Sequence, residues 1–118
     1  MSNQSEELRN RTKAFALRVI RLFRALPRSS EAQVLGKQLL RCGTSVAANY
    51  RAACRARSKP EFIAKIGIVV EEADECMLWM ELLIDAGIVK KEKLESLLNE
   101  ARQLTAIFTA SQQTARGK

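Results

Sequence analysis

The sequence predicts an all-α protein whose helices form one antiparallel, up-down four-helix bundle over residues 1–118. Apolar residues recur at the spacing of an amphipathic helix in four segments of about 22 to 28 residues. Only two prolines and five glycines occur, and Pro27, Pro60 and Gly87 lie at the breaks between segments. β-branched residues never alternate with polar residues over the length of a strand, so no sheet is expected. Short connections make consecutive helices antiparallel neighbours.

The first two expected helices cover about residues 5–26 and 31–57. Pro27 ends the first helix because proline lacks the backbone N–H that a helix interior needs. Ser30 followed by Gln33 has the pattern of a capping box, which predicts the start of the second helix. The apolar stripes expected to face the core are Leu8, Phe15, Val19, Leu22, Phe23 and Leu26 on the first helix, and Leu35, Leu39, Cys42, Val46, Tyr50 and Ala53 on the second.

The third and fourth expected helices cover about residues 59–86 and 90–114. Ser58 followed by Glu61 is a second capping box. Gly87 is expected to end the third helix, since glycine readily takes the left-handed conformation found at helix ends. The corresponding stripes are Phe62, Ile66, Val69, Ala73, Met77, Met80 and Ile84, and Leu94, Leu97, Leu98, Ala101, Leu104 and Phe108.

The third expected helix carries a second apolar face, made by Ile68, Leu78, Trp79 and Leu82. Grouped apolar residues on the outside of a bundle usually mark a contact surface. The second expected helix is rich in small residues that allow close helix approach: Gly36, Gly43, Ala47, Ala48, Ala52, Ala53 and Ala56. Together these features predict a homo-oligomer, with tight packing inside one bundle as the alternative for the small residues. Asn49 is expected to be a buried amide that fixes helix register or the subunit contact.

Charge is divided unequally along the chain. The first 57 residues hold 12 lysines and arginines and three acids, a net charge of +9, whereas residues 58–118 hold eight bases and ten acids, a net charge of −2. Such asymmetry between halves is typical of proteins that bind a polyanion.

Most bases of the first half lie on helix faces away from the apolar stripes. The predicted nucleic-acid-binding residues are Arg11, Arg18, Arg21, Arg24, Arg28, Lys37, Arg51 and Arg55. Arginine suits phosphate because its planar fork forms bidentate hydrogen bonds and stays charged. We expect salt-dependent binding of RNA or DNA backbone without a base-reading code, since Tyr50 and Trp79 are not interleaved with the arginines.

Two other interpretations of the basic face stay open. It can bind an acidic protein partner, such as a polymerase or another nucleic-acid enzyme. It can also serve only for solubility or for pairing with acids of the third helix, namely Glu71, Glu72, Asp74 and Glu75.

The sequence predicts no catalytic residue, metal site or cofactor. It has no histidine, which excludes histidine-based triads, general bases and metal ligands, and it has no glycine-rich phosphate loop. The remaining enzyme hypothesis is a Mg²⁺-dependent nucleotide pyrophosphohydrolase, because Glu71, Glu72 and Glu75 form an E-E-x-x-E motif on one helix. The second acidic pair of such enzymes is incomplete here, with Glu81 and Asp85 at E-x-x-x-D spacing.

We expect a cytoplasmic protein with reduced thiols. No apolar run approaches the roughly 18 residues that span a membrane, and residues 1–10 lack the features of a secretory signal. Cys42, Cys54 and Cys76 are odd in number and form no CxxC motif, so they are expected as small, buried, reduced side chains.

Residues 41–83 resemble the four-helix-bundle proteins encoded in intervening sequences of bacterial 23S rRNA genes, often labelled S23 ribosomal proteins. The matching residues are Arg41, Ser45, Ala48, Asn49, Arg57, Ser58, Lys59, Glu61, Phe62, Glu71, Glu72, Glu75, Trp79, Glu81 and Leu82. The chain departs from the family at Ala52, where members usually carry glutamate, so a role of that glutamate does not transfer.

The resemblance implies a homopentameric ring of four-helix bundles. It also implies a relationship to the accessory protein of diversity-generating retroelements, which works with a reverse transcriptase and has a basic nucleic-acid-binding surface. The intervening-sequence branch has no settled function, and its ribosomal label reflects where the genes lie.

Overall fold

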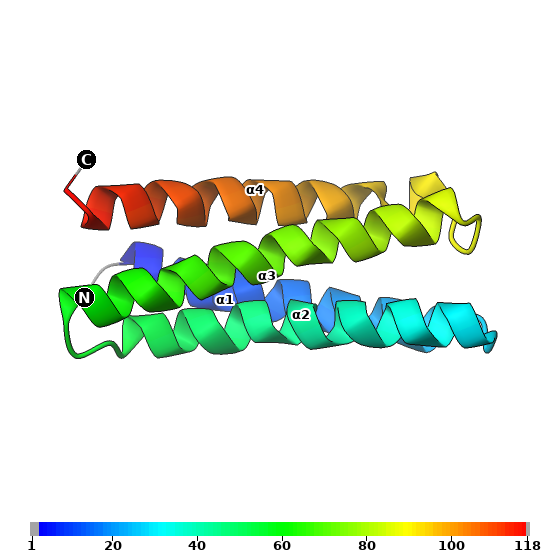
Figure 1. Cartoon of the computed structure of the whole chain (residues 1–118), viewed down its shortest axis with the longest axis horizontal. Coiled ribbons are helices and arrows are strands. Elements are labelled where there is room, and N and C mark those ends of the chain that lie inside the picture. Colours follow the sequence, from blue (N-terminus) through cyan, green and yellow to red (C-terminus); the bar gives the residue numbers. More distant parts are fainter. Residues whose placement is uncertain (1–2, 118) are drawn as a thin grey trace.

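Four helices make up nearly all of the chain in the computed structural model, which describes residues 3–117. Helix α1 spans Asn3–Ala25, α2 spans Ser30–Cys54, α3 spans Lys59–Asp85 and α4 spans Lys91–Ala115. The helices run alternately up and down in an elongated bundle of 45 × 22 × 21 Å (Figure 1). No strand occurs within the described residues. The predicted all-α, four-helix fold is confirmed.

The start of α2 differs from the prediction by one residue. Ser29, and not Ser30, is the N-cap, and its Oγ accepts a hydrogen bond from the Ala32 backbone N–H at 3.4 Å. The reason is backbone conformation: Ser29 is extended, at φ −62° and ψ 154°, whereas Ser30 already belongs to the helix. The expected capping box at Ser30 is therefore wrong. Helix α2 also ends at Cys54, three residues before the predicted end.

The signals at the two ends of α3 are confirmed. The Glu61 backbone N–H donates to Ser58 Oγ at 3.2 Å, so Ser58 is the N-cap. At the other end Gly87 has a φ of +74°, in the left-handed region that favours glycine. These two residues fix where the long central helix begins and ends.

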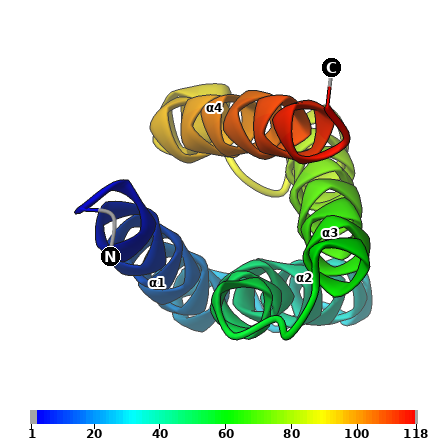
Figure 2. The same ribbon diagram turned by 90° about the vertical axis from the view of Figure 1, so that its left-hand side faces the viewer.

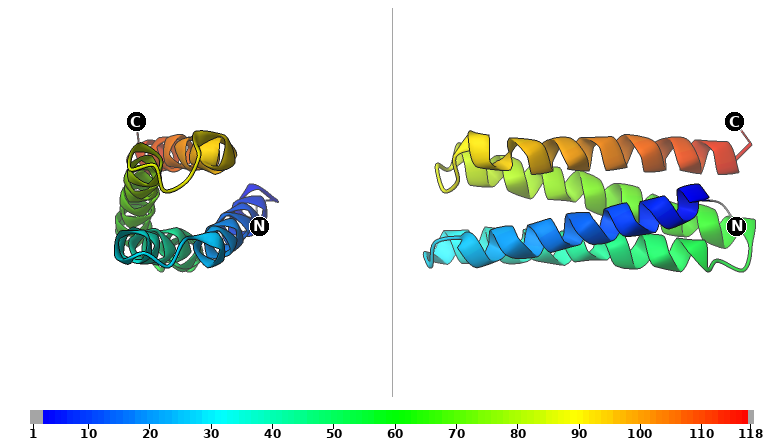
Figure 3. Two further views of the ribbon diagram at one scale, coloured as in Figure 1. Left: turned by 90° about the vertical axis from the view of Figure 1, so that its right-hand side faces the viewer. Right: turned by 180° about the vertical axis from the view of Figure 1, so that it is seen from behind.

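Seen end-on, the helices follow one another around the bundle in chain order, and the widest separation is between α1 and α4 (Figure 2). The view from the opposite end shows the same order (Figure 3). Helices α2 and α3 share the most extensive packing, and α1 and α4 share the least. Helix α1 is thus attached to the bundle chiefly through α2.

The core is apolar except for Thr12, whose hydroxyl donates to the Leu8 and Arg9 carbonyls at 2.9 and 3.0 Å. Buried residues from all four stripes form one cluster. No helix within residues 3–117 is long and apolar enough to cross a bilayer.

The three cysteines are free thiols. Cys42 and Cys76 are fully buried between α2 and α3, and their sulfur atoms lie 3.2 Å apart. The hydrogen bond with Cys42, together with burial, raises the pKa of the Cys76 thiol far above its ordinary value. The expectation of burial is wrong for Cys54, which is half-buried because it lies at the last turn of α2.

Candidate nucleic-acid interface

The eight bases predicted to bind nucleic acid do not form one surface. Two of them, Arg11 and Arg18, point toward α4. Arg11 donates from Nε and Nη2 to the two carboxylate oxygens of Glu100 at 2.7 and 2.9 Å, and from Nη2 to Gln103 at 2.7 Å. Arg18 donates to Ser96 Oγ at 2.9 Å. These two arginines link the loosely packed α1 and α4.

The bidentate pair has an electrostatic consequence. The hydrogen bond to Glu100 raises the pKa of Arg11 above its ordinary value. Because Glu100 neutralises its charge, Arg11 is less available to phosphate than an unpaired arginine.

The other six predicted bases are exposed. Arg21 and Arg24 lie on the last turns of α1, Arg28 lies in the connection to α2, and Lys37 lies on α2. Arg51 and Arg55 lie at the end of α2, where Arg55 is the C-cap residue. None of these six forms an ion pair within the described residues.

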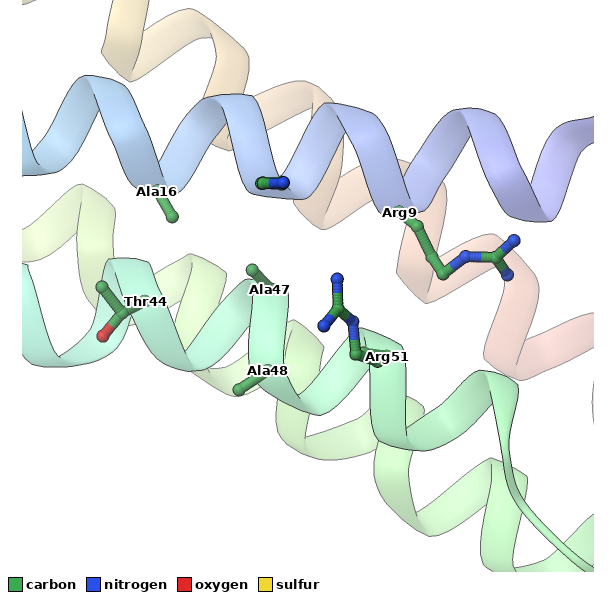
Figure 4. Close-up of a pocket in the computed structure, with 7 residues that line it drawn as sticks. Arg9, Ala16, Thr44, Ala47, Ala48 and Arg51 are labelled. Carbon is green, nitrogen blue, oxygen red and sulfur yellow. The ribbon is translucent and has the colours of Figure 1, made fainter.

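Arg51 faces α1 across a hollow of about 440 Å³ that Arg9 and Lys13 line from α1. Figure 4 shows Arg51 pointing from α2 toward α1, with small side chains of both helices next to it along the hollow. These small residues are Ala16 of α1 and Thr44, Ala47 and Ala48 of α2. A second hollow, of about 500 Å³, is lined by Ser5, Arg9, Arg51, Cys54 and Arg55.

Because Arg9 and Arg51 line both hollows, the two form one continuous groove between α1 and α2. We call it the α1–α2 basic groove and define it by Arg9, Lys13, Arg51 and Arg55. No acidic side chain lines either hollow in the part of the chain that the structure describes. Arg9 donates to the neutral Ser5 hydroxyl at 2.8 Å, which leaves its charge uncompensated.

Sequence reasoning missed Arg9 and Lys13. The chosen bases of α1 lie opposite its apolar stripe or flank that face, whereas Arg9 and Lys13 lie on the side of α1 that faces α2. Two signals would have found them. Arg9 and Lys13 are four residues apart on α1, as are Arg51 and Arg55 on α2, and the small residues of α2 mark the side that α1 approaches.

Two of the acidic side chains of α3 belong to a cluster that is separate from the groove. Arg41 of α2 donates to both Glu72, at 3.2 Å, and Glu75, and Trp79 donates to Glu75 at 3.1 Å. Two of the three carboxylates of the E-E-x-x-E motif are thus bound by one arginine. No group of three or more candidate metal ligands occurs among the described residues.

The outer face of α3 is partly apolar, as the sequence indicates. Leu78 is 47% exposed and Leu82 is 37% exposed, while Ile68 and Trp79 are half-buried. Val34 of α2, which the sequence reasoning missed, is 61% exposed. The Arg41–Glu75 and Cys42–Cys76 contacts fix the antiparallel register of α2 and α3, which places Val34 level with Leu82.

Asn49 differs from the expectation of a buried amide. Its side chain is half-buried, and Nδ2 donates to the Ser45 carbonyl one turn earlier at 3.0 Å. The amide therefore hydrogen-bonds within α2 and makes no cross-helix link through this bond.

Comparisons with known proteins agree on one family. The profile of the 23S rRNA-intervening sequence protein family matches residues 5–110. A crystal structure of an S23 ribosomal protein family member of unknown function, from Bacteroides thetaiotaomicron VPI-5482, superposes with a TM-score of 0.86. The two chains are 32% identical, over 92% of this chain and 97% of the other. No match was found among curated proteins. The chain belongs to the 23S rRNA-intervening sequence protein family, as the resemblance of residues 41–83 predicted.

Proposed function

We propose that the protein is a non-enzymatic module that binds the backbone of RNA or DNA through α1 and α2. The observation that carries this proposal is the α1–α2 basic groove, which four cationic side chains line without an acid among its lining residues. The exposed Arg21, Arg24, Arg28 and Lys37 extend the positive surface along the same two helices.

Phosphate is the ligand that these side chains fit best. Three of the four cationic residues of the groove are arginines, and a guanidinium group can donate two parallel hydrogen bonds to one phosphate. Binding of this kind is sequence-independent and releases counterions, so it weakens steeply with salt. Tyr50 is buried and Trp79 lies on α3, so neither is placed to stack bases near the groove.

Self-association is the second part of the proposal. The partly exposed Ile68, Leu78, Trp79 and Leu82, with Val34 beside them, offer an apolar surface of the kind that contacts another subunit. The pentameric number comes from the family resemblance alone. Several copies of one groove on one assembly would raise the affinity for a long polyanion through multivalency.

Fluorescence anisotropy with a structured RNA and a matched DNA duplex, at low and physiological salt, tests nucleic-acid binding. We expect saturable binding near micromolar at low salt, weakened by added salt. The groove variant carries Arg9→Gln, Lys13→Gln, Arg51→Gln and Arg55→Gln. Its matched control carries Lys90→Gln, Lys91→Gln, Lys93→Gln and Arg102→Gln, which lower the net charge equally on the exposed surface around α4.

The groove variant should bind at least about tenfold more weakly than the matched control, since only its substitutions remove phosphate contacts. Equal losses in both variants would mean that net charge and not the groove is responsible. Absence of saturable binding at low salt to these probes and to a single strand would overturn the proposal in favour of an acidic protein partner.

Two further measurements test the remaining parts. Light scattering behind size exclusion should give an oligomer mass at micromolar concentration, and Leu78→Glu with Leu82→Glu should reduce it toward the monomer; a monomer mass for the native protein contradicts self-association. Incubation with nucleoside triphosphates and Mg²⁺ or Mn²⁺ should give no turnover. Turnover that Glu71→Gln or Glu75→Gln abolishes would contradict the non-enzymatic proposal.

A further inference from the structure

The α1–α2 basic groove is elongated, which restricts the ligand that can fill it. Its lining residues on α2 run from Thr44 to Arg55, a length of about 16 Å at the rise of an α-helix. Cations stand on both walls: Arg9 and Lys13 on α1, and Arg51 and Arg55 on α2. A ligand that uses all four must be an anion extended along the groove.

The floor of the groove is shallow, small and uncharged. Ala16 is 8% exposed, Ala47 is half-buried and Ala48 is exposed. The Thr44 hydroxyl hydrogen is already donated to the Leu40 and Arg41 carbonyls, at 2.8 and 3.1 Å. The floor thus leaves room for an extended ligand but offers few groups that could hydrogen-bond to a nucleobase. The ligand would therefore be recognised by the cationic side chains of the two walls.

A duplex fits this groove poorly. Its phosphates stand in two rows on a stiff, convex surface, while neighbouring helices in a bundle lie only about 8–10 Å apart. A duplex would rest on the rim and engage one wall. A single strand is flexible, and it can lie within the groove and direct successive phosphates to both walls.

We propose that the α1–α2 basic groove is a binding site for single-stranded polynucleotide, held through about four phosphates. The proposal rests on the nucleic-acid-binding function proposed above and specifies its ligand. RNA and DNA strands share the recognised chemistry, the phosphodiester chain, so both bind. Neutralising four phosphates of a single strand gives a slope of about −2.8 for log K against log salt concentration.

The test compares an unstructured pyrimidine DNA strand, an RNA strand of the same length and a DNA duplex of that length, by anisotropy across a salt series. The native protein should bind both single strands about tenfold or more tightly than the duplex. The groove variant should lose single-strand binding by about tenfold or more, and its salt slope should approach zero. The matched control variant, with Lys90→Gln, Lys91→Gln, Lys93→Gln and Arg102→Gln around α4, should keep most of the single-strand affinity.

A second variant tests the groove without removing its lysine and arginine side chains. Ala48 is exposed on the groove floor, so Ala48→Glu should weaken single-strand binding severalfold by charge repulsion, whereas Ala48→Gln should not. Circular dichroism and thermal unfolding establish that each variant is folded.

The outcomes separate the two proposals. Duplex binding as tight as single-strand binding, or single-strand binding that survives both the groove variant and Ala48→Glu, would overturn the single-strand site and leave nucleic-acid binding standing. A lack of saturable binding to all three probes at low salt would overturn both.

Discussion

Helix α1 meets α2 and α4 in different ways, although both contacts contain arginines. On the α2 side the backbones are close: a Cβ at Gly43 would lie 2.9 Å from both γ-carbons of Val19. On the α4 side the packing is sparse and polar, and Arg11 holds Glu100 there. The cations of the α4 side are bonded to α4, and those of the α2 side line a groove without acids.

The comparison shows that the number of lysines and arginines on a helix does not by itself define a nucleic-acid-binding surface. Arg9 and Arg11 are two residues apart, yet Arg11 forms a bidentate ion pair and Arg9 keeps an uncompensated charge. What distinguishes them is the neighbouring helix toward which each points. The predictions below test this difference, beginning with the largest expected effect.

The alkaline titration of Tyr50 should report how well its ring is buried among α1, α2 and α4. Tyr50 is 6% exposed, lies beside Ser5 and Leu8 of α1, and packs against Phe108 with ring centroids 4.9 Å apart. Burial, with a contribution from Cys54, raises the pKa of Tyr50 to about 12. Because Tyr50 is the only tyrosine, its ionisation can be followed by ultraviolet absorbance, and we expect a midpoint near pH 12.

The same shift predicts how stability depends on pH. Below about pH 10 the tyrosine is protonated in both folded and unfolded states, so its contribution is fully present. Between about pH 10 and 12 the unfolded state ionises first, and stability falls. Tyr50→Phe should flatten this part of the profile. A midpoint near 10 in the folded protein would contradict the burial of the Tyr50 ring.

Gly43→Ala should destabilise the protein by up to about 2 kcal/mol. The new methyl would overlap the stiff, branched side chain of Val19, a cost of about 1–3 kcal/mol, which is only partly offset by the better helix propensity of alanine, about 1 kcal/mol. Gly67→Ala is the matched control: its methyl would meet only the end of the Gln112 side chain, whose Nε2 donates to the Ile63 carbonyl at 3.2 Å. The propensity gain of about 1 kcal/mol offsets the cost of displacing this hydrogen bond, about 0.5–1.5 kcal/mol, so Gly67→Ala should be close to neutral.

Urea unfolding of both variants measures the difference. If Gly43→Ala were as stable as the native protein while Gly67→Ala behaved as expected, the close approach of α1 and α2 would be contradicted.

The helices were predictable because local signals agree with the tertiary packing. Ser58 and Gly87 mark ends of α3 through backbone chemistry that no neighbour alters. At the start of α2, both Ser29 and Ser30 can serve as an N-cap, so the sequence placed the cap one residue too late. The small residues of α2 suggested close packing, but only the structure shows that Gly36 and Gly43 meet α1 of the same chain.

The candidate site was less predictable for a physical reason. A helical periodicity tells which side of α1 is apolar, but it does not tell which helix lies on either flank of that side. Arg11 and Arg9 lie on opposite flanks, and only the position of α4 against one and α2 against the other decides their roles. The outer face of α3 was predictable from its apolar residues, whereas Val34 escaped attention because it stands alone on α2.

The Arg11–Glu100 pair should contribute about 0.5–1 kcal/mol to stability, the range of a partly exposed ion pair. The side chains are 32% and 19% exposed, so solvent screens part of the interaction. A double-mutant cycle with Arg11→Gln, Glu100→Gln and the double variant isolates this coupling in urea unfolding. A coupling free energy of zero would show that the Arg11–Glu100 ion pair does not stabilise the contact between α1 and α4.

The smallest expected effect is on binding by the same double variant. Arg11→Gln with Glu100→Gln leaves the net charge unchanged, and we expect its affinity for a pyrimidine single strand and its salt slope to equal those of the native protein. Arg51→Gln should instead weaken binding and reduce the slope by about 0.7, the loss of one phosphate contact. Lys93→Gln, with the same change in net charge on exposed α4, controls for the overall field. If the double variant bound as weakly as Arg51→Gln, the α4 side of α1 would also contact the strand, and the division of roles between the two sides of the helix would be wrong.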